Sequence, residues 1–322
     1  MKKSTWVLLA ASIIIISAYL LLSNGLFTKQ DETIPVWKDA SNNVNQSGEL
    51  TKGQQFTQIL TSTNWQGTRV YDSENNDLTD ANLNFIGLSK YNAETSRYEF
   101  FDKTTKESRG DYGVFFITND GKNRVLISES TGNQAVVEIT ELTEDMFTYK
   151  RMGKDANGND IEVFVDHIPY TETELTFTTP NKLLETFTGE VDKNIDGDEI
   201  LARTLWQGTV ALDEKGNDVS EYNTNFLGLA KYDSSTSKYE FFDPNTGESR
   251  GDYGYFNVVN GNKLRAHVSL GENKYGAILE ITELNEDKFT YKRKGKDKEG
   301  NEIIITVEHV PYEGNLEPSF SN

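Results

Sequence analysis

The chain has 322 residues, of which 51 are Asp or Glu, 32 are Lys or Arg and three are His, so its formal net charge is −19. The length predicts about two domains, and the acidity argues against nucleic-acid binding, because phosphate contacts need a basic face. The sequence has no Cys, which excludes disulfides, thiolate nucleophiles, Cys-ligated zinc and the lipid-modified Cys of a bacterial lipoprotein. Plentiful Gly and aromatic residues, with only six Pro, favour turn-rich β structure over disorder.

The N-terminus has the pattern of a signal anchor or a signal peptide over residues 1–28. Lys2 and Lys3 precede an apolar run at residues 6–22, which as a helix would span roughly 26 Å, close to the thickness of a bilayer core. Because the lysines lie on the N-terminal side, we expect the domains to face outward. The prediction is a single-pass protein of the cell membrane, with secretion after signal cleavage as the alternative. Residues 29–53 are polar and are predicted to form a flexible stalk.

The remaining chain contains two copies of one unit. Residues 65–68 (Trp-Gln-Gly-Thr) recur unchanged at residues 206–209, and the offset of 141 becomes 142 after an insertion near residues 271–275. A repeat of about 110 residues is a whole domain rather than a solenoid unit. We predict copy 1 over residues 54–175, a linker over 176–195, copy 2 over 196–314 and a tail over 315–322.

Copy 1 contains eight β-like runs, rich in β-branched and aromatic residues and joined mostly by short turns. They lie at residues 65–72, 85–92, 97–102, 112–119, 124–130, 135–142, 146–153 and 161–170. Eight sequential strands with short links form an antiparallel meander, and closing it into a barrel removes its exposed edges. The fold class is therefore all-β, with two tandem eight-stranded meander barrels, and a β-sandwich is the alternative.

Several motifs carry a family resemblance. Residues 65–68, 85–91 (Phe-Ile-Gly-Leu-Ser-Lys-Tyr), 98–102 (Tyr-Glu-Phe-Phe-Asp) and 108–113 (Ser-Arg-Gly-Asp-Tyr-Gly), with their counterparts in copy 2, resemble the DUF4822 domain family. The resemblance covers both copies and implies a Gram-positive bacterial source, but no activity. A Trp on the first strand of an eight-stranded meander is also similar to the pattern of lipocalins.

Basic and aromatic residues that recur in both copies are the candidate ligand contacts. If the basic side chains point into a barrel, they can bind an anionic head group, whereas cross-strand pairing with acids would be worth under about 1 kcal/mol each. The sequence thus predicts a non-catalytic binding module for a small or envelope-derived ligand. The candidates are Trp65, Lys90, Arg124 and Arg151 in copy 1, and Trp206, Lys231, Arg265 and Arg293 in copy 2.

An Arg-Gly-Asp triplet recurs in both copies just before a predicted strand. On an exposed loop it would offer a cation and a carboxylate to an integrin, which makes a surface adhesin the alternative function. A turn that needs Gly, with Arg and Asp paired across it, is the structural interpretation. The residues are Arg109, Gly110 and Asp111, and Arg250, Gly251 and Asp252.

No catalytic set, metal site or cofactor is predicted. An acid–His pair recurs at residues 166–167 and 308–309, but no nucleophile or second His accompanies it at a matching place. Residues 192–198 begin like an EF-hand loop, yet Arg203 stands where a bidentate Glu is required. A hydrolase is therefore the third hypothesis, based on acids shared by the copies: Glu99 and Glu240, Asp102 and Asp243, and Glu141 and Glu283.

Overall fold

The computed structural model describes residues 49–179, 187, 189 and 191–321. The predicted anchor at residues 1–28, and the stalk up to residue 48, lie outside these residues. Within the described ranges, no helix has both the length and the apolar character needed to cross a membrane. The described residues form one compact unit.

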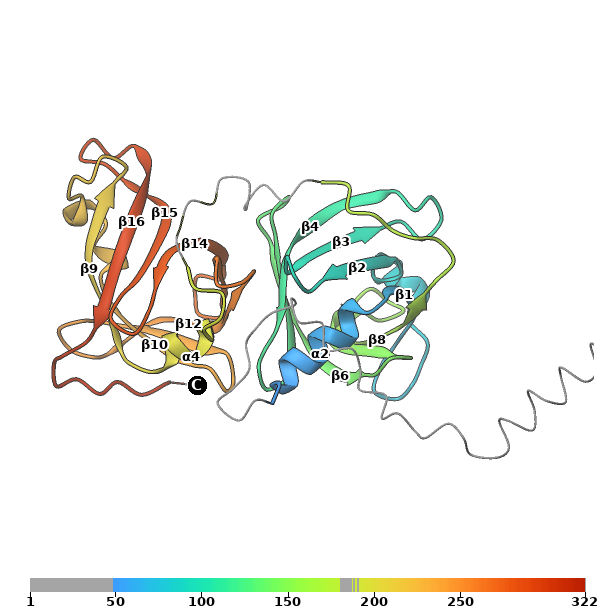
Figure 1. Cartoon of the computed structure of the whole chain (residues 1–322). Helices are drawn as coiled ribbons and strands as arrows, with labels where there is room; N and C mark the ends of the chain where they lie inside the picture. The colour runs from blue at the N-terminus through green and yellow to red at the C-terminus, as the bar shows by residue number, and fades with distance from the viewer. Residues whose placement is uncertain (1–48, 180–186, 188, 190, 322) are drawn as a thin grey trace, which may run out of the picture. The chain divides into compact units, whose positions relative to one another are not determined.

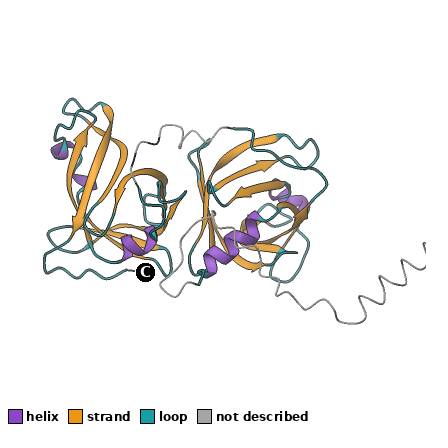
Figure 2. Ribbon diagram, viewed as in Figure 1, coloured by secondary structure: helices purple, strands orange, loops and turns teal. Residues whose placement is uncertain are grey.

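Copy 1 folds as a closed antiparallel barrel, barrel 1, in which each strand pairs with its neighbours in sequence and β1 closes onto β8 (Figures 1 and 2). Its elements are α2 (Lys52–Thr61), β1 (Asn64–Tyr71), η1 (Thr79–Phe85), β2 (Leu88–Asn92), β3 (Arg97–Phe101), β4 (Ser108–Ile117), β5 (Asn123–Ser128), β6 (Gln134–Leu142), β7 (Phe147–Lys154) and β8 (Asp160–Tyr170).

Copy 2 forms barrel 2 with the same order and the same closure, β9 onto β16. Its elements are α4 (Gly197–Ala202), β9 (Trp206–Asp213), η2 (Ser220–Tyr222), η3 (Thr224–Phe226), β10 (Leu229–Asp233), β11 (Lys238–Phe242), β12 (Ser249–Val259), β13 (Leu264–Ser269), β14 (Gly276–Leu284), β15 (Phe289–Lys296) and β16 (Glu302–Pro311). The predicted barrels are confirmed, and the sandwich alternative is wrong because each sheet closes on itself.

A short helix, which the sequence analysis did not predict, closes one end of each barrel. Thr51 caps α2 in a capping box with Gln54, so the last two residues of the predicted stalk are helical. Leu60 of α2 is fully buried, and its carbonyl accepts a hydrogen bond from the Trp65 indole at 2.8 Å. In barrel 2 the Trp206 indole donates to the carbonyl of Leu201 in α4 at 2.9 Å. Each Trp thus ties the first strand to the helix that precedes it.

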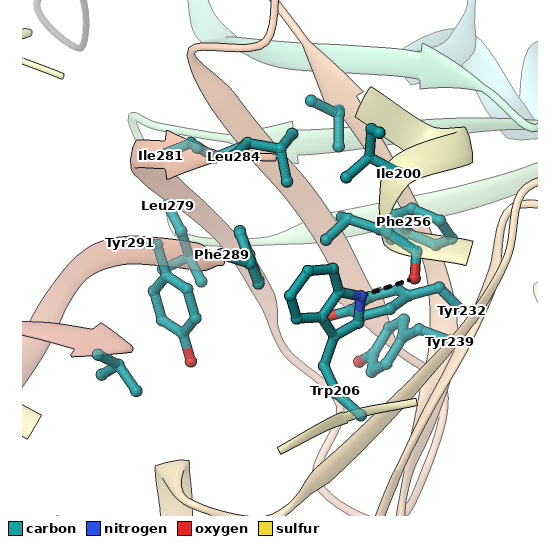
Figure 3. Packing of buried hydrophobic residues seen from close by; sticks show 14 of the residues in the cluster. Ile200, Trp206, Tyr232, Tyr239, Phe256, Leu279, Ile281, Leu284, Phe289 and Tyr291 are labelled. Atoms are coloured by element: carbon teal, nitrogen blue, oxygen red, sulfur yellow. Dashed lines mark hydrogen bonds between the residues drawn. The ribbon is translucent and has the colours of Figure 1, made fainter. Parts of the chain in front are cut away.

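Aromatic rings fill the core behind each Trp. In barrel 2 the rings of Phe256, Phe289 and Tyr291 belong to the cluster around Trp206 (Figure 3). Phe289 meets Trp206 edge-on with ring centroids 6.1 Å apart, and Phe147 meets Trp65 in the same way at 5.9 Å. These rings are almost fully buried and are among the largest side chains of each core.

A third apolar cluster joins the outer faces of the two barrels within the compact unit. It comprises side chains from β4 and β5 and from β12 and β13: Val114, Phe116, Val125, Ile127, Val259, Leu264, Ala266 and Val268. The second halves of β4 and β12 are therefore buried on both faces, one against the barrel core and the other against this cluster.

Candidate functional site

Barrel 1 contains a cavity of about 380 Å³ that opens at the end opposite α2. Strand β5 begins next to the turn at Asn119, whose carbonyl accepts a hydrogen bond from Gly53 of α2, and it ends at Ser128, which lines the cavity. The volume lies within the range of small-molecule sites. The barrel therefore has a closed end and an end with access to its interior.

The lining of this cavity is positively charged although the protein is acidic. Three arginines line it, Arg109, Arg124 and Arg151, and Asp111 is the one carboxylate among the lining residues. The wall is completed by aromatic side chains such as Phe100 and by small polar ones. A cavity with more cations than carboxylates, in a chain with net charge −19, favours an anionic occupant.

Arg124 is the most deeply placed of the three arginines. Its side chain projects from β5 among rings, with the guanidinium carbon 4.6 Å from the ring centroid of Tyr149 and 5.2 Å from that of Phe147. Nη1 donates to the Tyr91 hydroxyl at 2.6 Å, while Nε has no hydrogen-bond partner. Among the described residues no ion pair includes Arg124, which is only 3% exposed. A buried cation without a carboxylate is costly unless an anion completes its environment.

Arg151 projects into the same cavity from β7. Its guanidinium carbon lies 4.1 Å from the ring centroid of Phe85, and its buried Nε has no partner. The preceding Lys150 points the other way, where it pairs with Glu138 at 2.9 Å and Glu162 at 3.5 Å. Neighbouring residues on a strand face opposite sides of the sheet, so one of these two cations faces the cavity and the other faces solvent.

His167 of β8 lines the cavity as a neutral imidazole. Burial, together with the charge of Arg124, lowers its pKa to about 3. The ring packs against Phe147 and Tyr149, with centroid distances of 5.5 and 5.2 Å, and Nδ1 has no hydrogen-bond partner. The adjacent Asp166 accepts a hydrogen bond from the Thr148 hydroxyl instead, at 2.8 Å. The acid and the His of the recurring pair therefore face opposite sides of the strand.

The Arg-Gly-Asp triplet of copy 1 forms a β-bulge at the cavity mouth. Ser108 pairs with Phe101 and Tyr112 pairs with Glu99, so the residues between them bulge out of the ladder. Gly110 has a φ of 72°, the left-handed region that favours Gly. Asp111 accepts hydrogen bonds from the Tyr98 hydroxyl at 2.9 Å and from the Ser128 hydroxyl at 3.0 Å.

The two charged side chains of the triplet do not pair with each other in either copy. Arg109 donates from Nη1 to the carbonyl of Asn84 at 3.0 Å, and Arg250 donates to the carbonyl of Asn225 at the same distance. Gly251 has a φ of 69°, and Asp252 accepts from the Tyr239 hydroxyl at 2.9 Å. The bulge thus turns the Asp toward the barrel interior and holds the Arg against the neighbouring loop.

A family model described as a domain of unknown function, DUF4822, matches residues 57–177 and 198–320. The chain belongs to the DUF4822 family. No curated protein matches the sequence. Each match spans one barrel and the segment that follows its last strand, so each DUF4822 domain is a closed eight-stranded barrel with an appended segment.

Solved structures resemble the chain only distantly. A protein of unknown function from the DUF3598 family of Nostoc punctiforme PCC 73102 is 9% identical, with 80% of this chain and 99% of that chain covered and a TM-score of 0.22. A putative thioesterase II from Thermobifida fusca YX is 8% identical, with 56% and 75% covered and a TM-score of 0.11. At such TM-scores neither likeness bears on the function of these DUF4822 domains.

The other predicted ligand contacts lie away from the cavity of the first DUF4822 domain. Trp65 is fully buried in the core near the closed end. Lys90 lies 5.8 Å from the ring of Phe177, in the segment after β8. In the second domain, Trp206 occupies the position of Trp65, and Lys231 donates to the carbonyl of Pro318 at 2.7 Å. The two lysines therefore contact the segment that follows the last strand of their own barrel.

The arginines of the second DUF4822 domain repeat the arrangement of the first. Arg265 is buried, donates to the Tyr232 hydroxyl and lies 4.7 Å from the ring centroid of Tyr291. Arg293 lies 3.5 Å from the ring centroid of Phe226, as Arg151 lies over Phe85. Both domains thus keep the same two inward-facing cations.

The acids proposed for hydrolysis are scattered. Glu99 and Glu240 accept hydrogen bonds from Thr178 and Ser321, in the segments after β8 and β16. Asp102 and Asp243 accept from backbone amides of their own turns. Glu141 is exposed on β6, and Glu283 lies beside Lys288 at 3.6 Å. Neither domain brings these acids together.

The acids of the EF-hand-like segment also do not point toward a common site. Asp196 caps α4 by accepting from the Glu199 amide, while Asp198 accepts from the amide of Val258 and from the side chain of Asn119. Burial raises the pKa of Asp198 to about 8. Within the ranges that the structure describes, no group of three His, Cys, Asp or Glu side chains could hold a metal ion.

Arg124 and Arg151 were predictable from the sequence, but the side chains that surround them were not. Tyr98, Ser128 and Asp111 meet because a bulge turns Asp111 inward, and a bulge leaves no periodic signal in a sequence. The sequence did contain one signal for this contact: the Tyr-Glu-Phe-Phe-Asp and Ser-Arg-Gly-Asp motifs recur in both copies, and pairing them as neighbouring strands places Tyr98 near Asp111.

Proposed function

We propose that the first DUF4822 domain is a non-catalytic binding module for a small anionic ligand, held by Arg124 and Arg151 inside barrel 1. The observation that carries the proposal is the cavity of barrel 1, lined by two inward-facing arginines that have no carboxylate partner among the described residues. Both line a cavity with an open mouth, and each has a buried Nε without a hydrogen-bond partner. An anionic ligand would supply the missing acceptors through charge-assisted hydrogen bonds.

A binding role has more support than catalysis or adhesion. Nucleophilic catalysis needs a nucleophile hydrogen-bonded to a base, and Nδ1 of His167 has no such partner among the described residues. Adhesion through the Arg-Gly-Asp loops needs a free carboxylate, whereas Asp111 already binds Tyr98 and Ser128. These contacts favour a role for the triplet at the cavity mouth.

The proposed location is the outer surface of the cell, with residues 1–28 as the membrane anchor and an envelope-derived ligand as the cargo. The support is the two lysines and the apolar run of the N-terminal sequence. Protease treatment of intact cells tests the location, because outward-facing domains would be digested while a cytoplasmic marker would survive.

Titration of the full-length protein with anilinonaphthalene sulfonate, an anionic aromatic fluorophore, tests the binding function. We expect saturable binding that Arg124→Gln and Arg151→Gln each weaken at least tenfold. Arg265→Gln, the matched change in barrel 2, should alter the affinity less than twofold. Thermal unfolding of each variant separates loss of the site from loss of the fold. Equal affinity of Arg124→Gln, Arg151→Gln and the parent protein would overturn the proposal.

A further inference from the structure

The second DUF4822 domain places one of its own phenol groups where barrel 1 has its cavity. Tyr275 lies just before β14, and its hydroxyl donates to Oδ2 of Asp252 at 2.7 Å. Oδ1 of the same carboxylate accepts from the Tyr239 hydroxyl. The ring of Tyr275 stands edge-on to His267, with centroids 5.6 Å apart. Burial and the Asp252 charge raise the pKa of Tyr275, so the phenol is a donor at neutral pH.

Barrel 1 has the corresponding carboxylate, Asp111, but no tyrosine at the position of Tyr275. The repeat places Asn133 opposite Tyr275 and Leu126 opposite His267, and both residues of barrel 1 line the cavity. Asp111 receives hydrogen bonds on Oδ1 from Tyr98 and Ser128, and its Oδ2 receives none from any described residue. The carboxylate oxygen that Tyr275 satisfies in barrel 2 is therefore open to an occupant of barrel 1.

The repeat gives the chemistry of that occupant. The Tyr275 hydroxyl donates to Asp252, and the charge of the buried Arg265 also acts on it. Barrel 1 keeps the corresponding Asp111 and Arg124, and it adds apolar walls from Phe100, Leu126 and Tyr149. An aromatic ring with a hydroxyl group matches these walls and the open Oδ2, while an anionic group matches the arginines.

We propose that the ligand of barrel 1 is a small hydroxyaryl carboxylate, whose hydroxyl donates to Oδ2 of Asp111 and whose carboxylate binds Arg124 and Arg151. The inference rests on the proposed anion-binding function and adds the substrate class. Tyr275 is the built-in counterpart of the hydroxyaryl part of this ligand, so its side chain takes in barrel 2 the position that a separate molecule takes in barrel 1.

Calorimetric titration of the full-length protein tests the inference with para-hydroxyphenylacetate and, as a matched probe without the hydroxyl, phenylacetate. We expect para-hydroxyphenylacetate to bind at least tenfold more tightly, because its hydroxyl adds a hydrogen bond to a carboxylate. Asn133→Tyr, which copies the phenol of barrel 2 into barrel 1, should abolish binding. Asp111→Asn should reduce the ratio of the two affinities, para-hydroxyphenylacetate over phenylacetate. Asp252→Asn in barrel 2 should leave this ratio unchanged.

The outcomes separate this inference from the function on which it rests. Equal affinity for the two probes, with both lost in Arg124→Gln, would overturn the hydroxyaryl ligand and leave the anion site standing. Absence of binding by either probe would overturn the ligand class, and the fluorophore titration would then decide the anion site independently. Binding by Asn133→Tyr at the parental affinity, in a variant with parental thermal stability, would also overturn the inference.

Discussion

The interiors of the two barrels share a framework and differ near the mouth. Arg265 repeats Arg124 down to its bond with a buried tyrosine hydroxyl, and His309 repeats His167, with burial and the nearby Arg265 charge lowering its pKa to about 3. The difference is that barrel 2 has His267 and Tyr275 where barrel 1 has Leu126 and Asn133. The core around each Trp is thus common to both copies, and the two interiors differ in the side chains beside the bulge.

This difference shows how a barrel changes its interior without changing its fold. Inward positions alternate with outward ones along every strand, so a substitution at one inward position changes the cavity and leaves the hydrogen-bond ladder intact. His267 pairs with Ala277 across β13 and β14, as Leu126 pairs with Ala135 across β5 and β6. Two barrels with the same backbone fold can therefore bind different ligands, or only one of them can bind a ligand.

The largest expected effect tests whether the buried Trp has the same role in both barrels. Trp65→Ala and Trp206→Ala should each destabilise their barrel by about 3–5 kcal/mol, because each removes a fully buried indole and its hydrogen bond to the preceding helix. Scanning calorimetry of both variants checks this. If one substitution lowered the free energy of unfolding by less than about 1 kcal/mol while the other lowered it by about 3–5 kcal/mol, the two cores would not be equivalent.

The second prediction concerns pH. Burial lowers the pKa of His167 and of His309 to about 3, and that of His267 to well below its ordinary value. As pH falls below about 6.5, the unfolded chain takes up protons at these positions and the folded barrels do not, so stability falls. Each His should cost about 2 kcal/mol by pH 5.

His267 is the buried histidine that barrel 2 has and barrel 1 lacks. Asp198 of α4 acts in the opposite sense, because its raised pKa lets the folded protein bind a proton that the unfolded chain takes up only at lower pH. His267→Gln should therefore reduce the loss of stability between pH 7 and pH 5 by about 2 kcal/mol relative to the parent protein, as calorimetry at each pH measures. An unchanged pH dependence in His267→Gln would show that His267 is not buried as a neutral group.

The third prediction exchanges the residues that distinguish the interiors. His267 is 2% exposed, its Nδ1 has no partner, and the Arg265 charge acts on it. His267→Leu should therefore stabilise barrel 2 by about 1 kcal/mol, and Leu126→His should destabilise barrel 1 by about 1–3 kcal/mol. Urea unfolding measures both changes. Destabilisation by His267→Leu would mean that the imidazole makes a contact that Leu cannot replace.

The sequence was sufficient for the strands and the closure, because eight alternating runs with short links leave few other topologies. It was insufficient for α2, whose ten residues are too few for a helical period to stand out. It also grouped Lys90 with the inward-facing arginines, although its neighbour Tyr91 points into barrel 1 toward Arg124 and therefore sends Lys90 outward. Which face a strand buries depends on bulges and closure, which a single sequence does not reveal.

The smallest expected effect tests whether neighbouring residues of β7 face opposite sides of the sheet, at Lys150 and Arg151. Lys150→Gln removes an exposed cation that pairs with Glu138 and Glu162, and pairs of this kind contribute little, so neither fluorophore binding nor unfolding should change measurably. Arg151→Gln, one residue later, should weaken fluorophore binding at least tenfold, while Arg293→Gln in barrel 2 should not. Equal loss of binding in Lys150→Gln and Arg151→Gln would show that charge near the mouth, rather than a side chain inside barrel 1, attracts the anion. A difference between these two adjacent residues is the result that only an interior site produces.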